Sequence, residues 1–166
     1  MLSKTIQSAI NQQVNDEMYS SYLYLSMATH CAEQNLNGIA GWMRVQSREE
    51  WGHGMKLYDY IHANGGHVEL KTIEGPKAKF KSPLDMFNQV LEHEKKVTVL
   101  ITKLYELAMK EKDYPTQIML EWFITEQVEE ENTAALIIDK LEMIGDSIPG
   151  LLYFDKELGK RAITAK

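Results

Sequence analysis

The chain of 166 residues has a formal net charge of −6, and 44% of its residues are hydrophobic. This length is typical of one domain that buries a sizeable core. The acidic balance disfavours nucleic acids and anionic membranes as partners. The one cysteine, Cys31, excludes a disulfide within the chain. No stretch approaches the roughly 20 apolar residues of a membrane span, and the first residues lack a signal core. We therefore expect a cytoplasmic protein with one domain over residues 1–166.

The first two predicted elements are long helices. In both segments apolar residues recur at every third or fourth position, which places them on one helix face. Ser3 can cap the first helix, and an Asn-Leu-Asn-Gly stretch at residues 35–38 separates it from the second. Two glycines at residues 65–66 end the second helix.

Two further long helices and a short one complete the predicted elements. Ser82 followed by Pro83 is a strong helix start, with a capping hydroxyl and a proline in the first turn. Residues 113–115 separate the third helix from the fourth, which ends near Gly145. The four long helices thus occupy about residues 3–145, and a fifth, short helix covers about residues 147–159.

The lengths of the connections predict the topology. The first and third breaks are short, so each joins an antiparallel helix pair. The middle break, about residues 65–81, is much longer. A helix of about 28 residues is about 42 Å long, and an extended linker of about 17 residues spans up to about 60 Å. The sequence therefore predicts an all-α four-helix bundle with a long crossover between helices two and three and a short C-terminal helix.

Polar residues interrupt the apolar stripe of every long helix. They form two sets offset by 77 positions: Glu17, Glu50 and His53, then Glu94, Gln127 and Glu130. Burying an ionised carboxylate without a partner costs several kcal/mol or more. Two divalent cations would neutralise the set, and carboxylates and imidazole suit iron, manganese or zinc. The pattern predicts a two-metal site, and the alternative is a plain bundle whose buried faces are misassigned.

These ligand types and spacings resemble the ferritin family, specifically its prokaryotic non-haem members, over essentially the whole chain. In ferritin-like di-iron bundles two helices give one Glu each and two give Glu-x-x-His. This chain departs in its second half, where Gln127 and Glu130 replace that motif. The resemblance implies a ferritin-like bundle, iron storage with ferroxidase activity, and a homo-oligomeric shell of 24 subunits. Dioxygen or hydrogen peroxide would be the oxidant.

The resemblance also implies roles for individual residues. The first iron would be held by Glu17, Glu50 and His53, with Glu50 bridging to the second. Glu94 and Glu130 would hold the second iron, which lacks a histidine and should bind more weakly. Gln127 would lie close to the iron pair.

Four more residues match positions around the iron pair in that family. Tyr24 matches a tyrosine beside the centre, although simple core packing is the alternative. A third iron site would use, together with Glu130, the acids Glu49, Glu126 and Glu129. For these outer acids the alternative is a solvated acidic face, since residues 129–131 are all Glu.

Three other functions compete with iron storage. A rubrerythrin-like di-iron oxidase or peroxidase would typically carry a Cys-x-x-Cys segment, which one cysteine cannot supply. A haem-bearing ferritin would have methionine where this chain has Trp51, so no haem is expected. A non-catalytic helical bundle leaves the buried ligands unexplained. Gln117 and Leu120 replace the acids that line a pore in animal ferritins, so the sequence does not predict the residues through which iron enters.

Overall fold

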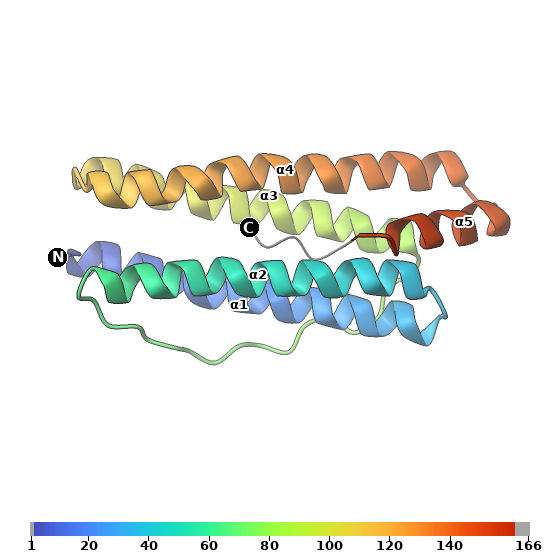
Figure 1. Cartoon of the computed structure of the whole chain (residues 1–166), viewed down its shortest axis with the longest axis horizontal. Helices are drawn as coiled ribbons and strands as arrows, with labels where there is room; N and C mark the ends of the chain where they lie inside the picture. Colours follow the sequence, from blue (N-terminus) through green and yellow to red (C-terminus); the bar gives the residue numbers. More distant parts are fainter. Residues whose placement is uncertain (1, 162–166) are drawn as a thin grey trace.

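The structure is a computed structural model that describes residues 2–161. The described residues form five α-helices. They are α1 (Lys4–Glu33), α2 (Asn37–Ala63), α3 (Pro83–Lys110), α4 (Tyr114–Ile144) and α5 (Ile148–Leu158). The four long helices lie side by side, and α5 packs at the end of the bundle where α4 ends (Figure 1). The predicted fold class is confirmed.

Side-chain caps start two of the long helices, α1 and α3, where the sequence predicts. The Ser3 hydroxyl accepts a hydrogen bond from the Ile6 amide at 3.1 Å. Ser82 does the same for the amide of Asp85 at 3.1 Å, with Pro83 in the first turn. Each cap satisfies a backbone N–H that lacks a partner within the helix. Local sequence therefore fixes where these helices begin.

The start of α2 is capped by another helix. Leu36 precedes α2 and offers no capping side chain. Instead, the Asp155 carboxylate of α5 accepts hydrogen bonds from the amides of Gly38 (3.0 Å) and Ile39 (2.7 Å). The approach is so close that a Cβ at position 38 would lie 1.7 Å from the Asp155 carbonyl oxygen. Glycine at position 38 thus lets α5 dock on the positive end of α2.

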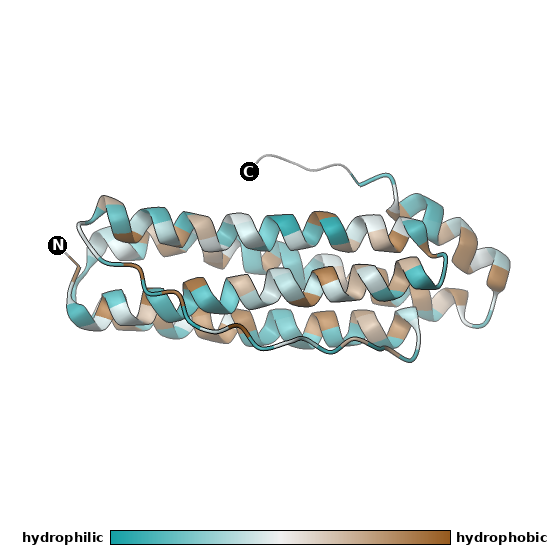
Figure 2. Ribbon diagram, turned by 90° about the horizontal axis from the view of Figure 1, so that it is seen from below, coloured by the Kyte–Doolittle hydropathy of each residue, from teal (hydrophilic) through white to brown (hydrophobic). Residues whose placement is uncertain are grey.

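The crossover, residues 64–82, runs the length of the bundle along α1 (Figure 2). Side chains of α1 hold its backbone, among them Asn11 and Asn15. Asn11 donates to the His67 carbonyl (2.9 Å) and accepts from the Glu69 amide (2.8 Å). Asn15 accepts from the Lys71 amide at 2.7 Å. The crossover brings α3 parallel to α2 (Figure 1), as the linker length predicts.

The core consists of two apolar clusters with a polar layer between them. One cluster includes Met27, Ile39 and Phe87 at the end of the bundle near α5. The other includes Ile10 and Phe123 toward the opposite end. The predicted ligands lie in the intervening turns of α1–α4. Within residues 2–161, no helix combines the length and apolarity needed to cross a bilayer.

Candidate metal centre

All six residues predicted from the apolar stripes are buried in the polar layer. Their exposed fractions lie between 1% and 7%. They are Glu17 on α1, Glu50 and His53 on α2, Glu94 on α3, and Gln127 and Glu130 on α4. Four helices thus contribute polar groups to one region, so the assignment of buried faces made from the sequence is correct.

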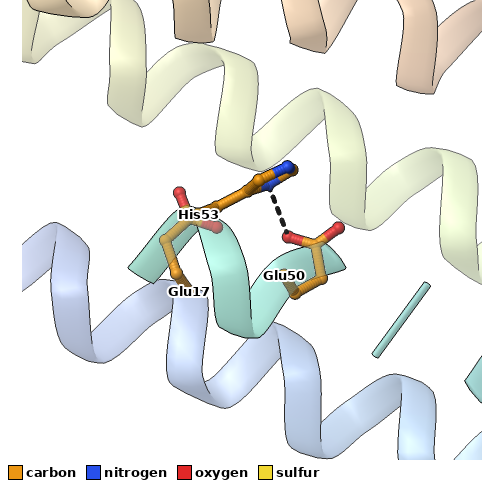
Figure 3. A group of neighbouring side chains, drawn as sticks. All are labelled: Glu17, Glu50 and His53. Carbon is orange, nitrogen blue, oxygen red and sulfur yellow. Dashed lines mark ion pairs between the residues drawn. The ribbon is translucent and has the colours of Figure 1, made fainter. Parts of the chain in front are cut away.

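Three of these residues form a compact ligand group (Figure 3). One ligand atom each from Glu17, Glu50 and His53 lie within 4.8 Å of one another. The His53 Nδ1 and Glu50 Oε2 atoms are 3.4 Å apart. Glu50 and His53 are three residues apart on α2, which places both on one helix face. The hairpin of α1 and α2 therefore presents two carboxylates and an imidazole to the same point.

The carboxylate of Glu17 is satisfied on one side only. Its Oε1 accepts a hydrogen bond from Gln13 Nε2 at 2.8 Å. Its Oε2 is buried and has no hydrogen-bond partner among the described residues. A buried acceptor without a partner costs about 1–3 kcal/mol, and more if charged. A cation bound between Glu17, Glu50 and His53 would supply the missing partner.

A second ligand group shares the histidine. His53, Glu126 and Glu130 each bring one ligand atom within 4.8 Å of the others. Glu126 and Glu130 are four residues apart on α4, and both are buried. From the sequence Glu126 belongs to an outer, third site. The structure places it within reach of His53 as well.

Glu94 is held by other side chains of the layer. The Tyr24 hydroxyl donates a hydrogen bond to Glu94 Oε1. Gln127 Nε2 donates to Glu94 Oε2 at 3.1 Å and to the Glu94 carbonyl at 3.2 Å. Tyr24 therefore does more than pack in the core. Among the described residues, neither group of three converging ligands includes Glu94.

Gln46 is a member of the layer whose role the sequence does not predict. This fully buried amide donates to Glu50 Oε1 at 2.8 Å and to Glu130 Oε2 at 2.9 Å. It lies on the α2 stripe one turn before Glu50, which is the one available signal. Its counterpart at the 77-residue offset is Phe123, so the repeat that marks the other ligands does not mark it.

Burial and mutual repulsion set the charges of the layer. Burial, with repulsion from Glu50, raises the pKa of Glu17 to about 8 and that of Glu130 to about 7. The same two causes raise the pKa of Glu94 well above its ordinary value. Without metal, Glu17 and Glu94 therefore hold protons at neutral pH, and Glu130 releases its proton close to neutral pH.

Glu50 and His53 form the charged pair of the layer. Burial alone would raise the pKa of Glu50, but the hydrogen bond and charge of His53 lower it. Burial alone would lower the pKa of His53, but Glu50 raises it to about 9. Because metal ligands must be deprotonated, a metal ion that binds here displaces the His53 and Glu17 protons.

The outer acids have different surroundings. The Glu49 carboxylate pairs with the guanidinium of Arg161, beyond the end of α5. Glu126 is buried, whereas Glu129 is exposed on α4. Within residues 2–161, neither converging ligand group includes Glu49 or Glu129. The structure thus brings Glu126 and Glu130 together with His53, and the third site as a whole stays a prediction.

Comparisons with known proteins agree with this geometry. The family model described as a ferritin-like domain matches residues 7–144. A bacterial non-heme ferritin of Staphylococcus haemolyticus is 43% identical over 98% of both chains. One of Bacteroides fragilis is 42% identical over 97% of this chain and its own full length. Among solved structures, an open pore ferritin from Archaeoglobus fulgidus superposes with a TM-score of 0.97 at 46% identity, covering 98% of this chain and all of that one.

Proposed function

The chain belongs to the ferritin-like family, and from this premise we propose that it stores iron. Fe(II) binds at the buried centre, is oxidised there, and is deposited as ferric mineral inside a shell of copies of the same chain. The observation that carries the proposal is the ligand group of Glu17, Glu50 and His53, with its unpartnered oxygen on Glu17. The relatives named as ferritins and the matched family support it.

Two adjacent iron positions suit this chemistry. Glu17, Glu50 and His53 hold the first Fe(II), and Glu50, Glu94 and Glu130 hold the second, with Gln127 and Tyr24 beside it. Two ferrous ions together supply the two electrons that convert dioxygen and two protons to hydrogen peroxide. They can equally convert hydrogen peroxide and two protons to water. Carboxylate oxygens favour the more highly charged ferric product because they are hard, anionic ligands.

The second position is proposed to bind iron more weakly than the first. Glu94 already accepts hydrogen bonds from Tyr24 and Gln127, and Glu130 accepts one from Gln46. A metal ion must displace or rearrange these donors, and no histidine belongs to this position alone. Weak binding suits a centre that passes iron on to a store. The third site is proposed to receive the iron next. Its residues are Glu49, Glu126, Glu129 and Glu130.

Assembly into a shell is part of the proposal. Large apolar side chains lie exposed on the long helices of the isolated chain, among them Tyr22, Leu25, Val128 and Leu136. Exposed apolar surface of this kind favours association with other subunits. The shell of 24 subunits and the cytoplasmic location remain predictions from the family resemblance.

The test is aerobic addition of Fe(II) to the purified metal-free protein. We expect rapid oxidation of two Fe(II) per chain, followed by retention of many more iron atoms per chain in a large particle. Oxygen consumption, ferric absorbance, particle mass and retained iron measure these steps. A monomer or dimer that oxidises iron but keeps only about two ions would instead support a rubrerythrin-like oxidase or peroxidase.

A further inference from the structure

The guanidinium of Arg161 lies against α2 at the outer edge of the metal centre. Its Nη2 pairs with the Glu49 carboxylate, and its Nη1 donates to Gln46 Oε1 at 2.8 Å. Its central carbon lies 4.4 Å from the centre of the Trp42 ring. The side chain is 23% exposed. Three separate contacts therefore hold one cation beside the buried acids.

The fold delivers Arg161 to this place. Asp155 anchors α5 on the first turn of α2, and Gly159 lies against Gly38. From this anchor the chain runs beside α2. Residues 42, 46 and 49, which Arg161 contacts, are four and three positions apart and share one face of α2. The position of Arg161 thus follows from how α5 is docked.

Arg161 reaches the metal ligands through one amide. A guanidinium only donates hydrogen bonds, so it requires the oxygen of the Gln46 amide on its side. The amide nitrogen must then face the other way, where it donates to Glu50 and Glu130. Arg161 therefore fixes the orientation of Gln46, and Gln46 occupies one oxygen of each carboxylate.

We propose that Arg161 acts as a built-in cation that competes with metal ions for the outer position of the centre. The outer position is the proposed third site, where Glu126 and Glu130 lie within reach of His53 and beside Glu49. A metal ion arriving there must displace Gln46 from Glu130 and share the neighbourhood of Glu49 with the guanidinium. The inference rests on the proposed iron chemistry. It assigns Arg161 a positioning role. Through Gln46, the arginine weakens the binding of the outer metal ion, which then leaves more easily toward the stored mineral.

The neighbouring Lys160 provides a matched control. Its ammonium pairs with Glu157 on α5, and its side chain is 63% exposed. Lys160→Gln removes the same charge one residue away from Arg161, but away from the contacts with α2. Arg161→Gln removes the charge at the centre, and Arg161→Lys keeps the charge without the planar, two-sided donor geometry.

The experiment is an anaerobic Co(II) titration of the metal-free, assembled full-length protein. Calorimetry and the visible Co(II) spectrum follow binding, and Co(II) replaces Fe(II) because it is not oxidised. In Arg161→Gln we expect the ions that follow the first to bind about tenfold tighter, since a competitor for their ligands is gone. The affinity of the first ion, at Glu17, Glu50 and His53, changes less, because Gln46 donates to Glu50 alone among these three ligands. Lys160→Gln matches the wild type, and Arg161→Lys lies between.

Several results would overturn this role for Arg161. The first is that the later ions bind to Arg161→Gln no more tightly than to the wild type. The second is an isotherm that stops at one ion per chain in every protein. The third is that the later ions bind to Lys160→Gln as tightly as to Arg161→Gln. Loss of the first ion in Arg161→Gln would also overturn it, since the residue would then support the inner ligands. Absence of tight binding in all four proteins refutes the metal centre itself, and the inference with it.

Discussion

The two helix hairpins place ligands at equivalent positions but prepare them differently. In the α1–α2 hairpin, Glu17, Glu50 and His53 converge, and one Glu17 oxygen is left without a donor. In the α3–α4 hairpin, Glu94 accepts hydrogen bonds from Tyr24 and Gln127. The constant offset of 77 residues therefore relates the positions of the ligands in the two hairpins, but not their residue types or their hydrogen bonds. The α1–α2 hairpin thus offers a cation one buried oxygen without a donor, whereas both oxygens of Glu94 in the α3–α4 hairpin already accept hydrogen bonds.

The largest expected effect comes from removing ligands that the α1–α2 hairpin contributes. Glu17→Ala and His53→Ala should each slow the initial oxidation of Fe(II) by about 100-fold, because each removes a direct ligand from a three-ligand group. Stopped-flow absorbance measures the rate, and particle size shows whether the assembly persists. An initial rate like that of the wild type would refute the assignment of the first iron position.

A substitution in the α3–α4 hairpin would make the ligands of the two hairpins more alike. Gln127→Glu replaces an amide donor to Glu94 with a second buried acid. We expect the metal-free protein to lose about 1–3 kcal/mol of stability, the usual cost of an unpaired buried polar group. The second Co(II) should bind more tightly, because a further oxygen ligand is present. Urea unfolding and metal titration measure the two effects, and weaker binding of the second ion would contradict the proposed role of the amide.

The pH dependence of the metal-free protein tests the charges of both halves. The pKa of Glu17 is raised to about 8, that of Glu130 to about 7, and that of His53 to about 9. A group whose pKa is raised on folding stabilises the folded state at low pH and loses that contribution as pH rises through the raised pKa. Stability should therefore fall from about pH 4.5, the ordinary pKa of Glu, to about pH 9, at up to about 1.4 kcal/mol per pH unit for each group that is still protonated in the folded state but already deprotonated in the unfolded state.

Urea unfolding of the metal-free protein at several pH values measures this slope. Glu50, whose pKa is lowered, contributes in the opposite sense but only at more acidic pH. Glu17→Gln should flatten the curve between about pH 4.5 and pH 8, because a neutral amide replaces the group that keeps its proton in the folded state and loses it in the unfolded state over this range. A slope that this substitution leaves unchanged would mean that Glu17 is ionised in the folded metal-free protein.

The smallest effect on the first oxidation is expected at the exposed outer acid. Glu129→Ala should leave the first two-iron oxidation unchanged, because Glu129 belongs to neither converging group in residues 2–161. Repeated additions of Fe(II) should show slower turnover if Glu129 serves the third site. Loss of the first oxidation would place Glu129 among the primary ligands.

The sequence predicts the features that depend on neighbouring residues. Helix starts at Ser3 and Ser82 follow from caps, and the buried ligands stand out because charged groups interrupt apolar stripes. The sequence shows that Tyr24 and Glu94 are polar, but it does not show that they form a hydrogen bond between α1 and α3. Their separation of 70 residues leaves no local pattern.

Features that join distant segments were not predictable. Gln46 gains its role from Arg161, which lies 115 residues further on, and the cap of α2 comes from Asp155 in α5. The attachment of the crossover to α1 depends on Asn11 and Asn15, which look like ordinary polar surface residues in the sequence. Such contacts arise only when the helices have packed, so no spacing rule indicates them.

The crossover suggests a way to divide the molecule. Its backbone is tied to α1 by Asn11 and Asn15, and again at Lys77 by Ser26. Between these ties, Gly75 has no neighbouring atoms that would crowd a Cβ. A chain cut there would give two separate fragments, each an intact hairpin that carries half of the ligands. Reassembly of the fragments would then rest on the two apolar clusters, to which both hairpins contribute, as well as on the shared ligand layer.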